Sequence, residues 1–135
     1  MILEATGKKF WFLKYLGAYT VQKGSKDIIT SLNYTAELLA DPDNLVLIFP
    51  QGTLYSNFAD NIHFQGGLAK ILKQAAGMFQ TVFSITFVEN MQFKKPSATI
   101  NLKLAERDYQ TVEELQKDYQ LYYQVTKLAQ SKNVV

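Results

Sequence analysis

Apolar residues recur along this chain with two periods, and each period predicts a different kind of element. Three segments carry the three-to-four-residue spacing of an amphipathic helix. They are a segment from the N-cap candidate Ser25 to the stop at Asp41-Pro42, a segment from about Gly67 to Ala76, and a segment opened by the capping box Thr111-Val112-Glu113-Glu114. We therefore expect three helices, with Gly77 suited to the C-terminal cap of the second.

Strand signals occupy four other segments. Ala18–Val21 predicts a short strand, and Thr81–Val88 is rich in β-branched and aromatic residues. Leu45–Phe49 is a continuous apolar run, which is typical of a strand covered on both faces. Ser97–Leu104 alternates apolar and polar residues, which predicts a half-buried strand at a sheet edge. The order β-α-β-α-β-β-α predicts an α/β fold, with a mixed sheet flanked by helices.

Composition narrows the class of protein. The 135 residues, 47% hydrophobic and 19% charged, fit one folded domain spanning residues 1–135. The net charge is only +2 and Arg107 is the sole arginine, so nucleic acid is not an expected partner. The absence of cysteine excludes disulfides and thiolate metal sites, and we predict no metal site. No apolar run approaches the ~18 residues of a membrane span, and no signal peptide is expected at the start.

The apolar run at Leu45–Phe49 ends abruptly in the turn Phe49-Pro50-Gln51-Gly52-Thr53. Ligands of open α/β sheets gather beyond the carboxyl ends of strands. Pro50 fixes its φ angle, while Gly52 permits a conformation closed to residues with a Cβ and lets a ligand approach the backbone. The Thr53 hydroxyl and nearby main-chain amides could hold an anion. From the spacing alone, a tight turn without a ligand is equally compatible.

A wider resemblance favours the anion site. It is carried by three segments in order, LGAYTVQK (16–23), LVLIFPQGT (45–53) and FQGGLA (64–69). Their order and spacing resemble those of the glycerolipid acyltransferases, the 1-acylglycerol-3-phosphate acyltransferase-like enzymes, over residues 10 to about 104. The resemblance implies phospholipid biosynthesis. A fatty acyl group would pass from acyl-CoA or acyl-carrier protein to a hydroxyl of a glycerol phosphate or lysophospholipid. It implies no cofactor beyond that acyl donor.

The resemblance also implies which residues bind the acceptor. The substrate-binding set that it indicates is Lys23, Phe49, Pro50, Gln51, Gly52 and Thr53. Lys23 stands where the family has arginine, which keeps the charge but loses the planar fork that grips phosphate. Gln51 and Leu54 replace a glutamate and a second arginine. The expected phosphate grip therefore relies on Lys23, the amides around Gly52 and the Thr53 hydroxyl, whereas Lys70 and Lys73 are more simply solvated helix residues.

The chain departs from the family at the catalytic block. The family has His-x-x-x-x-Asp upstream of the first segment, where the histidine is the general base and the aspartate orients it. No histidine precedes Gly17, and the fifth residue after His63, the only histidine, is Leu68. We therefore assign no catalytic residue and interpret His63 as a loop or helix-entry residue.

The missing block leaves two interpretations open. In the first, which we prefer, the chain is the C-terminal part of a longer, N-terminally incomplete acyltransferase domain, and is inactive alone. Loss of an early strand would then expose a sheet edge and favour self-association. In the second, the chain is a non-catalytic module that binds a lipid phosphate or a protein on the same scaffold.

The N-terminal segment is rich in aromatic and basic residues. Trp11 and Tyr15 suit a water–lipid boundary, and Lys8, Lys9 and Lys14 could reach anionic headgroups. This pattern predicts a cytoplasmic protein that is peripheral to the inner face of the membrane. A core helix whose aromatic side chains pack on the sheet is an equally compatible interpretation.

Overall fold

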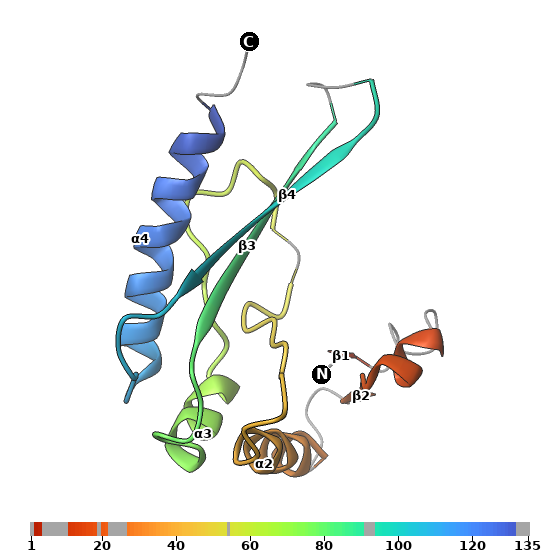
Figure 1. Ribbon diagram of the computed structural model, residues 1–135, viewed down its shortest axis with the longest axis vertical. Coiled ribbons are helices and arrows are strands. Elements are labelled where there is room, and N and C mark those ends of the chain that lie inside the picture. The colour runs from red at the N-terminus through yellow and green to blue at the C-terminus, as the bar shows by residue number, and fades with distance from the viewer. Residues whose placement is uncertain are drawn as a thin grey trace. The chain divides into compact units, whose positions relative to one another are not determined.

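The computed structural model describes residues 2–3, 11–18, 20–21, 27–53, 55–90 and 94–131 (Figure 1). Its elements, in chain order, are β1 (Ile2–Leu3), the 3-10 helix η1 (Trp11–Leu16), β2 (Thr20–Val21), α2 (Asp27–Leu39), α3 (Gly67–Gln74), β3 (Val82–Glu89), β4 (Ser97–Leu104) and α4 (Val112–Ser131). These elements belong to two compact units. The first unit comprises Met1–Pro50 and Gly66–Phe79, and the second comprises Gln51–Gln65 and Gln80–Val135.

A short parallel pair of strands opens the first unit. β1 pairs with β2 through Ile2↔Thr20 and Leu3↔Val21. The strand predicted at Ala18–Val21 is thus formed over its last two residues, while Tyr19 lies outside the described residues. The pairing of β1 was not predicted, because two residues are too few to show an alternating pattern.

Helices α2 and α3 form the core of the first unit. The predicted helix before Asp41 is confirmed as α2, whose apolar stripe buries Leu32 and Ala36. The hydroxyl of Thr35, also buried, donates to the Ser31 carbonyl at 2.8 Å, so burial leaves no unpaired hydrogen-bond donor there. The helix stops as expected, since the Asn44 side chain donates to a carbonyl of its last turn at 3.0 Å.

The second predicted helix is confirmed as α3. Leu68, Ile71, Leu72 and Ala75, the stripe expected from the sequence, are all buried. A Cβ placed on Gly67 would lie 3.7 Å from the Leu32 methyls, so α2 packs closely over the start of α3. Gly77 adopts a left-handed φ of 73°, which suits the predicted end of the helix.

The strand predicted at Leu45–Phe49 is not formed, and this prediction was wrong. Residues 44–49 have no regular secondary structure, and 95%, 62% and 60% of the surfaces of Leu45, Leu47 and Phe49 are exposed. An apolar run becomes a strand only where a neighbouring strand satisfies its backbone groups. No described strand pairs with this segment, and only Val46 and Ile48 of its five residues are half-buried.

The second unit is an antiparallel β-hairpin with a helix against one face (Figure 1). The register pairs Val82 with Leu104 through to Glu89 with Ser97, which confirms both predicted strands. Side chains of β3 alternate, and its buried ones, Phe83, Ile85 and Phe87, face α4. The apolar residues of β4 lie on the other face of the sheet and are exposed, so that strand is not half-buried as its alternation suggested.

Helix α4 begins where its capping signal predicted. The Thr111 hydroxyl accepts a hydrogen bond from the Glu114 N–H at 3.3 Å, one half of a capping box. The Glu114 carboxylate returns to the N–H of Gln110, one residue earlier than the usual partner, at 3.4 Å. The last predicted helix is thus confirmed, with its N-terminus fixed by its own side chains.

The fold is therefore a combination of helices and strands, as the α/β prediction required. The described strands form one parallel and one antiparallel pair rather than a single mixed sheet, and residues 45–49 add no strand to either pair. An acyltransferase-like arrangement over residues 1–135 stays a prediction.

Candidate functional site

The candidate site is the bend at Gln51–Thr53, in the second unit. Gly52 has a φ of 67°, a left-handed conformation that residues with a Cβ rarely adopt. Both Gly52 and Thr53 are exposed. Within the part of the chain that the structure describes, no group accepts a hydrogen bond from the N–H of Gly52 or Thr53. The bend therefore presents two main-chain donors and a hydroxyl to solvent.

Gln65 supports this bend from the FQGG segment. Its side-chain nitrogen donates to the Gln51 carbonyl at 3.4 Å. Its Cγ lies 3.2 Å from the place where a Cβ on Gly52 would stand. The contact brings together parts of two of the three segments that resemble the acyltransferase family. Any side chain at Gly52 would have to displace Gln65 as well as strain the backbone.

The other predicted binding residues are Lys23, Phe49 and Pro50. Lys23 lies outside the described residues. Phe49 and Pro50 belong to the first unit, because the boundary between the units falls between Pro50 and Gln51. Of the predicted set, the structure thus joins Gln51, Gly52 and Thr53 and adds Gln65 to them. The sequence pointed to Gln65 only as part of a motif.

His63 lies in the same unit, on the loop that precedes α3. Its side chain is exposed, and its N–H donates to the Tyr55 hydroxyl at 3.4 Å. Among the described residues, no carboxylate pairs with its imidazole. A general base of the His–Asp kind needs such an orienting carboxylate. The geometry thus agrees with the interpretation of His63 as a loop residue.

Arg107, the only arginine, is engaged by acidic side chains. Its guanidinium lies 3.1 Å from Asp118 and 3.9 Å from Glu114. The Tyr109 hydroxyl donates to the same Asp118 oxygen at 3.1 Å, and burial together with this hydrogen bond raises the pKa of Tyr109 to about 12. Arg107 therefore ties the loop after β4 to α4 and is not an open anion-binding group.

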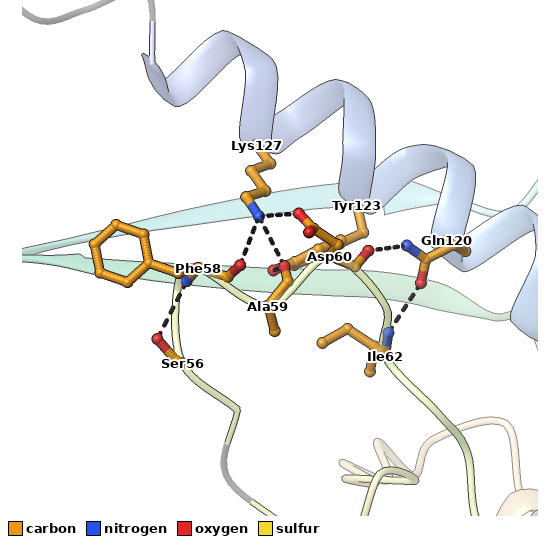
Figure 2. Close-up of polar contacts among 8 residues, drawn as sticks. All are labelled: Ser56, Phe58, Ala59, Asp60, Ile62, Gln120, Tyr123 and Lys127. Carbon is orange, nitrogen blue, oxygen red and sulfur yellow. Dashed lines mark hydrogen bonds and ion pairs between the residues drawn. The ribbon is translucent and has the colours of Figure 1, made fainter.

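A polar ladder on α4, formed by Gln116, Gln120, Tyr123 and Lys127, holds the loop that connects the bend to α3. The Gln116 side-chain oxygen accepts from the Phe64 N–H at 2.8 Å. One turn later, the Gln120 oxygen accepts from the Ile62 N–H at 3.1 Å, while its nitrogen donates to the Asp60 carbonyl at 2.6 Å (Figure 2). Helical spacing at i and i+4 places these side chains on one face. There they form hydrogen bonds with the backbone of the loop, as a neighbouring strand would.

The ladder continues to the last turns of α4. The Tyr123 hydroxyl donates to the Ala59 carbonyl at 2.8 Å. The Lys127 ammonium lies 2.8 Å from the same carbonyl, 3.1 Å from that of Phe58 and 2.9 Å from the Asp60 carboxylate (Figure 2). Reading the sequence missed this arrangement, because glutamine and lysine on a helix are usually surface residues. The signal available was the spacing of 116, 120, 123 and 127 on one helical face.

Two further predictions bear on partners. Trp11 and Tyr15 pack edge to face at 5.9 Å and are exposed by 65% and 72%, so neither lies in a core. Their exposure leaves a membrane-surface role as a prediction.

No helix in the described ranges is long and apolar enough to cross a bilayer. Nor do the described residues contain a His/Cys/Asp/Glu group that could hold a metal ion.

Comparison with known proteins adds no relative. No protein-family model, curated protein or solved structure matches this chain.

Proposed function

We propose that this chain binds the phosphate of a glycerolipid acceptor at the Gln51–Thr53 bend, as the acceptor-binding part of an acyltransferase domain. The observation that carries the proposal is the exposed left-handed bend at Gly52, whose flanking N–H groups have no acceptor among the described residues. Consecutive main-chain N–H groups around a left-handed residue form a concave site for anions. We choose a glycerolipid phosphate as the ligand because three sequence segments resemble the acyltransferases.

The chemistry of this bend suits a phosphate monoester. The N–H groups of Gly52 and Thr53 and the Thr53 hydroxyl can each donate to a phosphate oxygen. Hydrogen bonds to a charged acceptor contribute about 1.5–3 kcal/mol each. Lys23 is expected to add its ammonium, as the sequence predicts. Lys70 and Lys73 belong to α3, in the first unit, and the proposal does not use them.

Acyl transfer needs a further group that these residues do not supply. The acceptor hydroxyl must lose a proton as its oxygen attacks the thioester carbonyl, and the thiol of the donor leaves with a proton. Among the described residues, no histidine–carboxylate pair can accept that proton. The proposal therefore requires a base from a His-x-x-x-x-Asp block that is not among these 135 residues.

Phosphate recognition is tested by calorimetric titration with a short-chain lysophosphatidate, with the matching monoacylglycerol as the ligand without phosphate. We expect saturable binding of the first alone. Gly52→Ala should abolish it, because the new Cβ strains the bend and meets Gln65. Gly66→Ala is the matched control, since Gly66 has an ordinary φ of −62° and open space around it. Equal binding of both ligands, or equal effects of both substitutions, would overturn the proposal.

The lysine and hydroxyl contributions are tested separately. Lys23→Ala and Thr53→Val should each weaken lysophosphatidate binding about 10- to 100-fold, the equivalent of one charge-assisted hydrogen bond. Unchanged affinity of both variants for lysophosphatidate would show that the phosphate binds elsewhere.

The enzymatic part has its own assay. Acyl transfer from acyl-CoA and acyl-carrier protein is compared for this chain and for a polypeptide translated from DNA that extends upstream of Met1 through an Asn-His-x-x-x-x-Asp block. We expect activity of the longer form alone. A stop codon close upstream, or an inactive longer form that still binds lysophosphatidate, would refute the assignment as an acyltransferase. The interpretation as a non-catalytic binding module would then stand.

A further inference from the structure

The Gln65 side chain lies directly against the bend at Gly52. Outside the chain neighbours of Gly52, the three heavy atoms nearest to a Cβ placed on it all belong to Gln65: its Cγ at 3.2 Å, its Cδ at 3.8 Å and its Nε2 at 3.9 Å. Glycine has no side chain to fill this space, so the Gln65 amide can approach the backbone. A ligand held by the N–H groups of Gly52 and Thr53 would therefore lie beside that amide.

One end of the Gln65 amide is engaged and the other is open. The Nε2 donates to the Gln51 carbonyl at 3.4 Å, and this contact orients the amide, because its oxygen has no proton to give to a carbonyl. The Oε1 therefore points away from Gln51, and no donor among the described residues reaches it. Gln65 is exposed, so a ligand can reach this oxygen. The bend thus offers backbone donors and, beside them, one side-chain acceptor.

The position of Gln65 is held through the residue before it. The Phe64 N–H donates to the Gln116 side chain of α4 at 2.8 Å. The Phe64 ring also packs against Tyr119 of the same helix, with ring centres 5.1 Å apart. A binding group whose backbone is already in place loses less conformational freedom when the ligand arrives. The open acceptor is therefore presented at a defined place next to the bend.

We propose that Gln65 determines the specificity of this site by accepting a hydrogen bond from the free hydroxyl of the acceptor. This inference rests on the phosphate site proposed above. In lysophosphatidate the free hydroxyl is on the carbon next to the one that carries the phosphate ester. A phosphate on the backbone donors of Gly52 and Thr53 thus brings the hydroxyl close to the bend. The Gln65 Oε1 is an acceptor that the protein leaves open there.

Such a contact distinguishes the acceptor from its acylated product. Acylation converts the hydroxyl into an ester, whose oxygens can accept hydrogen bonds but have no proton to donate. The product therefore loses the contact with the Gln65 Oε1, which is also only an acceptor. Gln65 is a specificity-determining residue and not a catalytic one, because a carboxamide is not a base that can take the hydroxyl proton. That proton still requires the base that the proposed function places upstream of these residues.

Paired titrations test this role. Calorimetry compares short-chain lysophosphatidate with its deoxy analogue, which keeps the acyl chain and the phosphate but lacks the hydroxyl. The wild-type chain should bind lysophosphatidate about 2- to 10-fold more tightly than the analogue, the equivalent of one net hydrogen bond. The preference stays this small because Gln65 is exposed, so water can take the place of the missing hydroxyl.

Two substitutions of Gln65 should separate the hydroxyl contact from phosphate binding. Gln65→Lys keeps a donor for the Gln51 carbonyl but has no acceptor, so it should bring the ratio of the two affinities to one while its charge strengthens binding of both phosphates. Gln65→Glu keeps an acceptor, so it should retain the ratio while its charge weakens binding of both. Gln124→Lys is the control for added charge, since Gln124 is exposed on α4, and it should leave the ratio as in the wild type.

The outcomes separate this inference from the phosphate site itself. Equal, saturable binding of both ligands by the wild-type chain would overturn the role of Gln65 and leave the phosphate site intact. A preference that survives Gln65→Lys would likewise overturn it, because the hydroxyl contact would then belong to another residue. Binding of neither ligand would refute the phosphate site, and the role of Gln65 with it.

Discussion

Replacing Gln120 with leucine would remove the central rung of the polar ladder on α4. The Gln120 side chain makes two hydrogen bonds to the backbone of the facing loop, to the Ile62 N–H at 3.1 Å and to the Asp60 carbonyl at 2.6 Å. Leucine has a similar size and helix propensity but neither bonding group. Ile62 is only 6% exposed, so water cannot readily replace the lost acceptor.

The expected cost follows from what is left unpaired. A net hydrogen bond contributes about 0.5–1.5 kcal/mol, and a buried donor without an acceptor costs about 1–3 kcal/mol. The Asp60 carbonyl lies nearer the surface and can turn to water. We therefore expect a loss of about 2 kcal/mol, which lowers the urea midpoint by about 1 M for an m-value near 2 kcal/mol per M.

Urea unfolding followed by circular dichroism measures this loss, and hydrogen exchange at the Ile62 amide locates it. Gln124→Leu is the matched control, because Gln124 is exposed one turn further along the same helix. That variant should change stability by less than about 0.5 kcal/mol, as exposed substitutions do. Equal midpoints for the two variants, or unchanged exchange at Ile62, would refute the idea that the ladder holds the loop.

Three further predictions concern stability. Tyr123→Phe should cost about 1 kcal/mol in urea unfolding, because it removes the hydroxyl that donates to the Ala59 carbonyl. Between pH 10 and 12 the unfolded chain releases the Tyr109 proton before the folded chain does, since burial and Asp118 raise the folded pKa to about 12. Stability should therefore fall as the pH rises through that window, and Tyr109→Phe should flatten the fall measured by urea midpoints. Gly77→Ala should lower the melting temperature by the equivalent of about 1–2 kcal/mol through its φ of 73°, whereas Gly77→Asn should lower it less.

The elements that the sequence predicted correctly are those with local signals. α3 has a complete apolar stripe, α4 has a capping box, and β4 has clean alternation, and all three form close to their predicted bounds. Leu45–Phe49 has an equally strong apolar pattern and forms no strand. A strand depends on a partner that is remote in sequence, and the pattern of one segment carries no information about that partner.

The candidate site also contains a part that the sequence predicted and a part that it did not. The bend at Gly52 was predictable, because proline and glycine at this spacing favour a turn and the observed φ is left-handed. The gathering of Lys23 with this bend was a tertiary expectation that rested on the family resemblance, and it stays a prediction. The role of Gln116 and Gln120 was not predicted, since a glutamine that bonds to a remote backbone looks in sequence like any solvated glutamine and the spacing on one helical face was the only signal.

The ladder gives the proposed anion site its rigidity. Gln65, which supports the bend, directly follows Phe64, whose N–H is fixed by Gln116 at 2.8 Å. The bend itself has no strand beside it, because the segment before it is unpaired. A phosphate site made of main-chain donors binds well only if those donors are already in place, since ordering a loop on binding costs affinity. In a conventional α/β site, the hydrogen bonds of a sheet hold such a bend in place. Here the side chains of α4 do so, through the loop that carries Gln65.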